Sequence, residues 1–225
     1  QSPVSLVRIA CLVHEFARAL PVSRWLHDYG YRVGFNLMQV ADRSTDEIVD
    51  LARSASDYPV EVLYFADSMG SLTPIQTAAI IETFTRGWSG PLGVHAHDNM
   101  SLALQNTLTA LEHGASWVDA TVTGMGRGPG NTRMEELAVE VAERRHQRPN
   151  MIPLMNAVNR HFRPLQKRYE WGTNLYYYLA GRYGIHPTYI QEMLGDSRYD
   201  EAEIFAVIDH LRREGGKKFS LNNLD

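Results

Sequence analysis

Two histidines separated by one residue follow an apolar run, in the segment HAHDN at positions 95–99. Side chains at i and i+2 of a β-strand point to the same face, so His95 and His97 are expected to face the same way. Two imidazoles at this spacing can share one metal ion. The alternative is a pair of histidines satisfied in a polar network. Their place at a strand end, before Asp-Asn and a helix, favours the metal site.

A glycine-rich segment, GMGRGPGN at positions 124–131, follows the next apolar run. Its glycines permit turns with positive φ and a close approach of backbone to a ligand. Asn131 at its end has two interpretations that the residues leave open. It is either the N-cap of a helix whose first turn contains Glu135, or a further metal ligand through its amide oxygen. The loop could also be a phosphate cradle.

Two further features carry weaker signals. The segment ADSMG at positions 66–70 could orient a histidine or line a site, and turn formation or helix capping explains it equally well. Cys11 is the only cysteine and lies in an apolar run, so we expect an inert buried thiol rather than a nucleophile.

The apolar runs predict the elements that must position these residues. Five runs, at 4–13, 32–40, 60–66, 91–97 and 117–122, read as strands that are apolar throughout, as when both faces are buried. Helical periodicity lies between them, as at 45–55, 74–86 and 102–113. Each strand–helix pair takes about 25–31 residues, which is typical of βαβ units in a parallel sheet.

Five parallel strands cannot close a barrel, and a complete (β/α)8 barrel needs about 250 residues. Two arrangements remain, an open doubly wound sheet or a barrel without roughly its first three strands. The motifs at the strand ends favour the second. We therefore predict an α/β fold, with a partial (β/α)8 TIM barrel of about the last five β/α units at 1–148. A C-terminal helical appendage is expected at 149–225, with helices at 152–168, 175–183, 187–195 and 200–214.

Composition narrows the class of protein. The 225 residues carry a formal net charge of −4 and no basic run, so we expect neither nucleic-acid nor membrane binding. No apolar stretch approaches the roughly 18 residues of a membrane span. The first residues lack the pattern of a signal peptide. With a single cysteine, these features predict a cytoplasmic protein.

Taken together, HAHDN, GMGRGPGN and ADSMG resemble, in order and spacing, the motifs of the DRE-TIM metallolyases over roughly residues 6–141. This superfamily includes 3-hydroxy-3-methylglutaryl-CoA lyase and the isopropylmalate and homocitrate synthases. The residues of HAHDN and of the glycine-rich loop are most similar to those of the 4-hydroxy-2-oxovalerate aldolases. The resemblance implies a lyase (aldolase) that cleaves a carbon–carbon bond in a 2-oxo acid such as a 4-hydroxy-2-oxo acid, with pyruvate as the product. A divalent cation, Mn²⁺, Mg²⁺ or Zn²⁺, would act as a Lewis acid and stabilise the enolate.

The resemblance also implies roles for individual residues. His95 and His97 would bind the metal, with His95 next to the substrate as well, and Asn131 would be a ligand as in the synthase and lyase branches. Gln39 falls where the aldolases place a substrate-contacting serine, so this residue departs from the family pattern.

A tyrosine of the C-terminal helices also faces the active site in the aldolases. The spacing from Gly172 indicates Tyr177 as the catalytic tyrosine, although Tyr176 and Tyr178 stand beside it. The alternative is that all three tyrosines cover apolar helix surface.

One family motif is absent. No Arg-Asp-Gly segment occurs in the sequence. The residues that the family carries in and near this motif are therefore absent too: the aspartate that is the third metal ligand, an arginine that stabilises the enolate, and a histidine that acts as the base. If these residues were the whole molecule, we would expect little or no catalysis. The alternatives are therefore an acyl-CoA-dependent condensation on the same fold, or an inactive fragment or binding subunit. The expected partners are a small 2-oxo acid and either further copies of the chain or a partner dehydrogenase.

Overall fold

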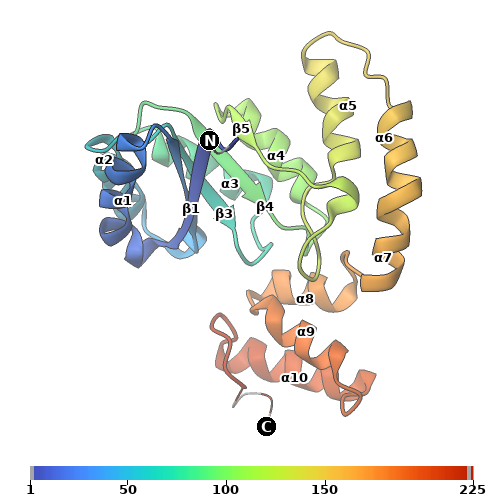
Figure 1. Ribbon diagram of the computed structural model, residues 1–225. Coiled ribbons are helices and arrows are strands. Elements are labelled where there is room, and N and C mark those ends of the chain that lie inside the picture. Colours follow the sequence, from blue (N-terminus) through green and yellow to red (C-terminus); the bar gives the residue numbers. More distant parts are fainter. Residues whose placement is uncertain (1–2, 222–223, 225) are drawn as a thin grey trace. The chain divides into compact units, whose positions relative to one another are not determined.

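The structure is a computed structural model that describes residues 3–221 and 224 (Figure 1). It divides into two compact units. The sheet unit comprises Gln1–Ser68, Leu72–Ala96 and Gln105–Asp119, and the helical unit comprises Met69–Ser71, His97–Leu104 and Ala120–Asp225. The predicted domains at 1–148 and 149–225 have different bounds from these two units. They describe a partial barrel and an appended helical region, and that description stays a prediction.

The sheet unit contains five parallel strands. They are β1 (Leu6–Leu12), β2 (Arg32–Met38), β3 (Val62–Asp67), β4 (Leu92–Ala96) and β5 (Trp117–Val118). Their spatial order, β1-β2-β3-β4-β5, is their order along the chain. A doubly wound sheet reverses its strand order at a switch point, whereas a TIM-barrel-like sheet does not. The α/β fold with a parallel sheet is confirmed, and its order is that of a TIM-barrel-like fold.

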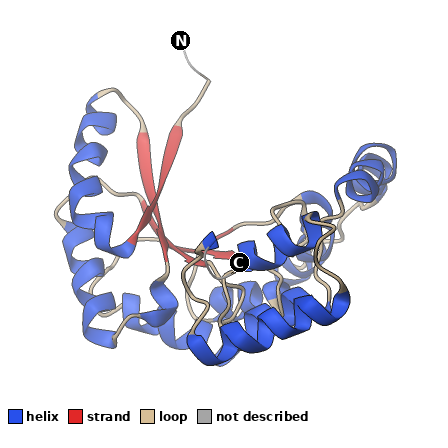
Figure 2. Cartoon of the chain, turned by 90° about the horizontal axis from the view of Figure 1, so that it is seen from below, coloured by secondary structure: helices blue, strands red, loops and turns tan. Residues whose placement is uncertain are grey.

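Helices cover one face of this sheet (Figures 1 and 2). They are α1 (Phe16–Asp28), α2 (Thr45–Ser56), α3 (Pro74–Phe84) and α4 (Ala103–Glu112). Alternate strand residues enter the core beneath them: Phe35 packs edge-on against Phe16 with ring centroids 5.2 Å apart, and Phe65 stacks on Phe84 at 6.2 Å. Right-handed crossovers between sequential strands place every connecting helix on the same face.

The helix starts follow from local capping. The Ser44 hydroxyl accepts a hydrogen bond from the Glu47 backbone N–H, and the Glu47 carboxylate accepts one from the Ser44 N–H. Thr73 and Gln76 form the same reciprocal pair at the start of α3, with Pro74 in its first turn. These boxes satisfy backbone donors that the first helical turn leaves unpaired.

The opposite face of the sheet is strongly curved. A flat sheet would separate β1 from β5 by four strand spacings, about 19 Å. The Arg8 guanidinium of β1 nevertheless lies 2.6 Å from the carboxylate of Asp119, the residue that follows β5. The sheet must therefore curl toward this face. The strands are also less uniformly buried than expected, because edge strand β1 buries only Cys11, whereas β3 is buried throughout.

The helical unit contains α5 (Met134–Arg144), α6 (Ile152–Ala157), α7 (Arg163–Tyr169), α8 (Leu175–Tyr183), α9 (Pro187–Gly195) and α10 (Glu201–Glu214). A π-helical stretch, Val158–Phe162, joins α6 to α7, so the helix predicted at 152–168 is continuous but irregular. Helices α8–α10 share a core of their own around Tyr189, Ile190 and Ile208.

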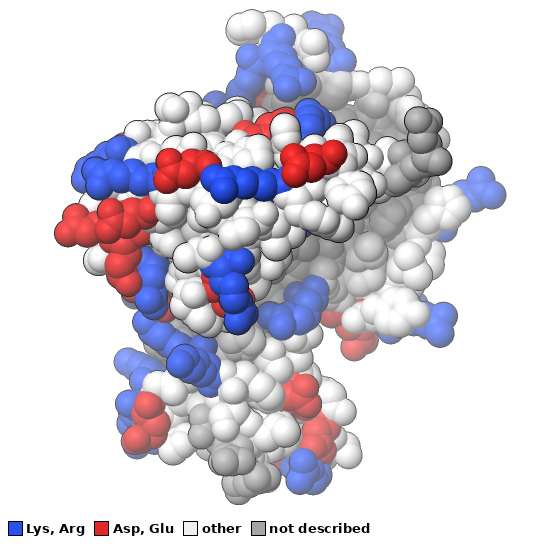
Figure 3. Space-filling model, turned by 60° about the vertical axis from the view of Figure 1, so that its left-hand side comes forward, with Lys and Arg blue, Asp and Glu red and all other residues white. Residues whose placement is uncertain are grey.

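The surface agrees with the composition. On the face shown in Figure 3, acidic and basic side chains are interspersed rather than gathered by sign. Within the part of the chain that the structure describes, every helix is too short or too polar to cross a membrane.

Candidate functional site

His95 lies near the end of β4, where its backbone pairs with Ala66 of β3. The strand ends one residue later, at Ala96, so His97 lies beyond it and not within it as predicted. The reason is that His97 pairs with a different partner, Asn131, in an isolated antiparallel bridge. His95 therefore belongs to the sheet unit and His97 to the helical unit.

In the sheet unit, a carboxylate that sequence reasoning missed meets His95. The Asp119 Oδ2 atom lies 2.8 Å from His95 Nδ1 and 2.6 Å from an Arg8 guanidinium nitrogen, while its Oδ1 accepts from Arg8 at 2.7 Å. Burial raises the pKa of Asp119, but the hydrogen bonds from His95 and Arg8 outweigh burial and hold the pKa below its usual value. Asp119 is therefore ionised at neutral pH. Strand periodicity could have indicated it, because Trp117 and Asp119 share one side.

In the helical unit, His97 and Asn131 face each other across their bridge, which the Asp98 N–H extends by donating to the Gly130 carbonyl at 2.9 Å. Directly opposed residues in an antiparallel pair project to the same side. The N-cap interpretation of Asn131 is wrong: α5 begins at Met134, after Arg133. Backbone pairing holds Asn131 three residues before the helix.

The Asn131 side chain is oriented by the glycine-rich loop. Its Nδ2 donates to the Met125 carbonyl at 3.1 Å, and a Cβ at Gly126 would lie 2.2 Å from that nitrogen. Its Oδ1 is buried and has no hydrogen-bond partner among the described residues. A buried amide oxygen without a partner is costly, and a bound cation would satisfy it.

The loop also contains a strained residue. Thr123 has φ 56° and ψ 19°, a left-handed conformation that a β-branched residue rarely adopts. Its N–H donates to both oxygens of the Glu135 carboxylate, at 2.9 and 3.1 Å, and its carbonyl accepts from Trp171 Nε1 at 3.1 Å. The surroundings therefore hold this conformation in place.

Tyr177 lies against the same loop. It is 5% exposed, and a Cβ at Gly128 would lie 3.1 Å from its hydroxyl. Tyr178, by contrast, is 46% exposed, and Tyr176 packs on Phe205. Burial raises the pKa of Tyr177, so its hydroxyl keeps its proton at neutral pH.

A polar cavity of about 520 Å³ adjoins Tyr177 in the helical unit. Its lining includes the loop residues Gly126, Arg127 and Gly128 together with Trp171 and Asn174. A cavity of this size can hold a small molecule, and its polar lining suits a charged or hydroxylated one.

Two residues of the sheet unit follow strand ends. Gln39 comes directly after β2 with φ 63°, and its backbone N–H donates to the Ser68 hydroxyl at 3.2 Å. The Asp67 carboxylate accepts from the Leu72 N–H at 3.2 Å, so it stabilises the turn after β3. The ADSMG segment thus has at least the turn-forming role, and its other predicted role, orienting a histidine or lining a site, stays a prediction. Asp119 is a carboxylate that meets His95.

The donors present fit a divalent cation in kind. Imidazole nitrogens and an amide oxygen are ligands that such ions accept. Among residues 3–221 and 224, no group of three or more His, Cys, Asp or Glu side chains is placed to hold a metal.

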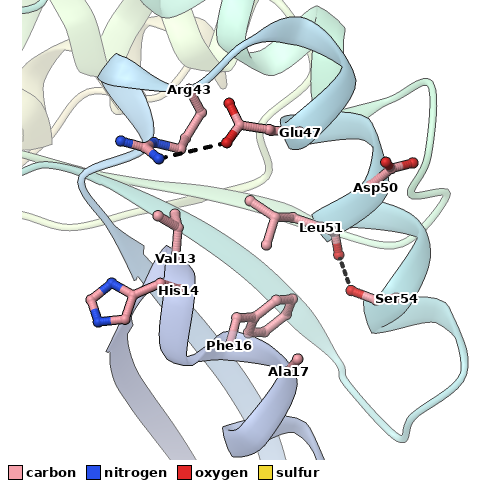
Figure 4. Close-up of a pocket in the computed structure, with 9 residues that line it drawn as sticks. All are labelled: Val13, His14, Phe16, Ala17, Arg43, Glu47, Asp50, Leu51 and Ser54. Atoms are coloured by element: carbon pink, nitrogen blue, oxygen red, sulfur yellow. Dashed lines mark hydrogen bonds and ion pairs between the residues drawn. The ribbon is translucent and has the colours of Figure 1, made fainter.

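A second pocket, of about 350 Å³, lies in the sheet unit between the start of α1 and α2 (Figure 4). Val13, His14 and Phe16 line one side, and an Arg43–Glu47 ion pair of 3.6 Å stands on the other. It contains none of the predicted site residues, and we assign it no part in the site.

Comparison with known proteins decides the family. The family model described as HMGL-like matches residues 12–159, more than half of the chain. The chain belongs to the HMGL-like family. This membership, together with relatives named as 4-hydroxy-2-oxovalerate aldolases, confirms the resemblance to the DRE-TIM metallolyases.

Curated relatives of this HMGL-like chain include aldolases. A 4-hydroxy-2-oxovalerate aldolase of Carboxydothermus hydrogenoformans is 29% identical over 178 residues, which are 77% of this chain and 52% of that protein. One of Thermus thermophilus is 41% identical over 107 residues, 47% of this chain and 30% of that protein. The chain spans about half the length of the curated relatives it matches, or less.

Solved structures agree on the fold of this HMGL-like chain. The N-terminal domain of an aldolase candidate from Bacteroides vulgatus has a TM-score of 0.81 and 30% identity, covering 90% of this chain and 67% of that one. The HMG-CoA lyase of Bacillus subtilis has a TM-score of 0.63 at 17% identity, covering 75% of this chain and 64% of that one. The second likeness shows the fold alone.

Proposed function

We propose that this chain contributes to a divalent-metal-dependent aldolase that cleaves a 2-oxo acid such as a 4-hydroxy-2-oxo acid. The observation that carries the proposal is the bridge that places Asn131 opposite His97. The Asn131 Oδ1 is one of six buried side-chain atoms that have no hydrogen-bond partner among the described residues. The names of the curated relatives support the same reaction. No observation favours the acyl-CoA-dependent condensation.

Each residue has a stated part in the proposal. His95 and His97 supply imidazole nitrogens and Asn131 supplies its amide oxygen to Mn²⁺, Mg²⁺ or Zn²⁺. When bound, the cation polarises the substrate carbonyl and stabilises the negative charge that bond cleavage leaves. Tyr177, protonated at neutral pH, donates a hydrogen bond from its hydroxyl to the substrate. Gln39 contacts the substrate from the end of β2.

The proposal also concerns the fold of the chain. We infer that the sheet is an arc of a (β/α)8 barrel and that residues 149–225 form an appended helical region. The curvature that brings Arg8 to Asp119, and the strand order, support the arc. The carboxylate ligand and the base would then come from strands outside these residues. Self-association, or association with a dehydrogenase, stays a prediction.

Metal binding is the first test. Mn²⁺ titrated into the 225-residue chain should bind at one site, detected by the loss of the free-ion electron paramagnetic resonance signal. His97→Ala and Asn131→Ala should each weaken binding by about tenfold or more. His161→Ala, on the π-helical stretch, serves as a matched control and should change nothing. Equal affinity in all four proteins would overturn the proposal.

Catalysis is the second test. The full-length gene product, incubated with 4-hydroxy-2-oxovalerate and Mn²⁺, should release a 2-oxo acid in a chelator-sensitive reaction. His95→Ala should abolish the release. An unchanged rate in His95→Ala would exclude the assigned site, whatever the affinity for metal.

A further inference from the structure

Three side chains from distant parts of the sequence are joined by hydrogen bonds and ion pairs on the face of the sheet toward which it curls. Arg8 comes from β1, His95 from β4, and Asp119 follows β5. Asp119 uses both oxygens: Oδ1 and Oδ2 each meet one Arg8 nitrogen, at 2.7 and 2.6 Å, and Oδ2 also meets His95 Nδ1 at 2.8 Å. The carboxylate thus bridges the guanidinium and the imidazole.

This geometry specifies which nitrogen of His95 carries the proton. Both oxygens of Asp119 pair with the Arg8 guanidinium, and a carboxylate in such an ion pair only accepts hydrogen bonds. Nδ1 of His95, which meets Asp119, must therefore be the donor. In the neutral imidazole, Nε2 then holds the lone pair that a ligand requires. Metal-binding histidines commonly have this arrangement, in which a carboxylate on one ring nitrogen orients the ring and sets its tautomer.

The Arg8 side chain is itself held in place. Its guanidinium lies over the ring of Tyr64, 4.4 Å from the centroid, on the same face of the sheet. Room for the stack comes from Gly93, where a Cβ would lie 2.6 Å from that ring. A bidentate, stacked arginine has fewer alternative positions than a lone surface ion pair.

Another histidine–carboxylate pair in the sheet unit shows the contrast. His113 Nδ1 lies 2.9 Å from Glu82, but these side chains are 37% and 59% exposed and lie at the C-terminal ends of α4 and α3. For His95 and Asp119 the exposed fractions are 22% and 20%. Exposed pairs contribute little because water and salt screen them. The Asp119 pair is the better protected of the two.

We propose that Asp119, held by Arg8, is the positioning residue of His95, keeping the ring in its Nδ1–H tautomer, in which Nε2 is the nitrogen that would bind a divalent cation. The part of this inference that concerns metal binding rests on the proposed function. The part that concerns the orientation of the ring does not. No motif that the sequence presented contains either Arg8 or Asp119.

The tautomer gives a direct test. In the metal-free, ¹⁵N-labelled chain, long-range ¹H–¹⁵N spectra distinguish Nδ1–H from Nε2–H imidazoles, and His95→Gln identifies the signals of His95. The wild-type ring should be Nδ1–H, and Asp119→Asn should shift it toward Nε2–H. Glu82→Gln, the matched control, should leave the His95 signals unchanged. A wild-type ring protonated at Nε2, or a tautomer indifferent to Asp119→Asn, would overturn the proposal.

Metal affinity forms the second arm. Asp119→Asn should weaken Mn²⁺ binding roughly 10–100-fold, and Glu82→Gln should not. A changed tautomer with unchanged affinity in Asp119→Asn would refute the positioning role toward the metal. If instead His95→Ala leaves Mn²⁺ binding intact while the tautomer still depends on Asp119, the proposed function fails and the orientation by Asp119 stands.

A third variant tests the contribution of Arg8 with a milder substitution. Arg8→Lys keeps the positive charge on β1 but loses the bidentate contact with Asp119. It should shift the tautomer and the affinity in the same direction as Asp119→Asn, by a smaller factor. A wild-type tautomer together with wild-type affinity in Arg8→Lys would remove Arg8 from the proposal.

Discussion

His97 and Asn131 lie opposite each other in an antiparallel bridge although 34 positions separate them in the numbering. The bridge brings a histidine that follows one strand to an asparagine that ends the loop after the next. It leaves the Asn131 Oδ1 buried with no hydrogen-bond partner in the described part of the chain. This relationship makes Asn131 the residue whose substitution is most informative.

Two changes at Asn131 should separate the oxygen from the rest of the side chain. Asn131→Asp keeps an oxygen and adds a negative charge, so Mn²⁺ affinity should be retained or increased. Asn131→Ala should lower it by about tenfold or more. Isothermal titration calorimetry measures both, and Asn159→Ala, on the π-helical stretch, is the control. Equal affinity of Asn131→Ala and wild type would exclude Asn131 as a ligand.

Glu135 should stabilise the glycine-rich loop through the Thr123 backbone. Glu135→Ala removes both acceptors of the Thr123 N–H and should lower the free energy of unfolding by about 1–3 kcal/mol. Glu136→Ala is a close control, because both residues lie in the first turn of α5 but Glu136 only pairs with exposed Arg133. It should cost less than about 1 kcal/mol. Urea unfolding followed by tryptophan fluorescence compares them, and equal losses would contradict the role of Glu135.

Contact between Gly128 and Tyr177 should appear as a difference between two glycine substitutions. Gly128 and Gly30 both have positive φ, 56° and 84°, so alanine carries a conformational cost at each. At Gly30 the new Cβ meets nothing within 4 Å, whereas at Gly128 it meets the Tyr177 hydroxyl and ring at 3.1 Å. Gly128→Ala should therefore lose more stability, by about 1 kcal/mol or more. In a Tyr177→Leu background the two losses should converge; a persistent gap would mean that another contact is responsible.

Much of the fold could be predicted because its signals are local. Helices α8 and α9 have the predicted bounds, 175–183 and 187–195, because Asn174 caps the first, Gly184 ends it in a left-handed conformation, and Pro187 opens the second. The parallel strands also follow from the spacing of apolar runs. Strand ends were less accurate: the run at 117–122 forms a strand only at Trp117–Val118, because the chain turns into the glycine-rich loop.

The site was predicted less completely, since its contacts link distant positions. His95 and His97 share a motif, but His97 pairs with Asn131 and His95 meets Asp119. Asp119 in turn binds Arg8, which lies 111 positions before it in the sequence. A pattern of neighbours along the chain does not contain such pairs. The curvature of the sheet creates them.

Cys11 gives a prediction about pH. Burial raises the pKa of its thiol to about 11, with a smaller contribution from Glu15. A thiol whose pKa is higher in the folded than in the unfolded chain keeps its proton in the folded state alone between the two values, so stability falls as pH rises from about 9 toward 11. Cys11→Val should flatten this fall, by up to about 1.4 kcal/mol per pH unit. Urea unfolding of both proteins from pH 7 to 10.5 measures it. Rapid labelling of Cys11 by a disulfide reagent in the folded chain at pH 8 would contradict the buried, protonated thiol.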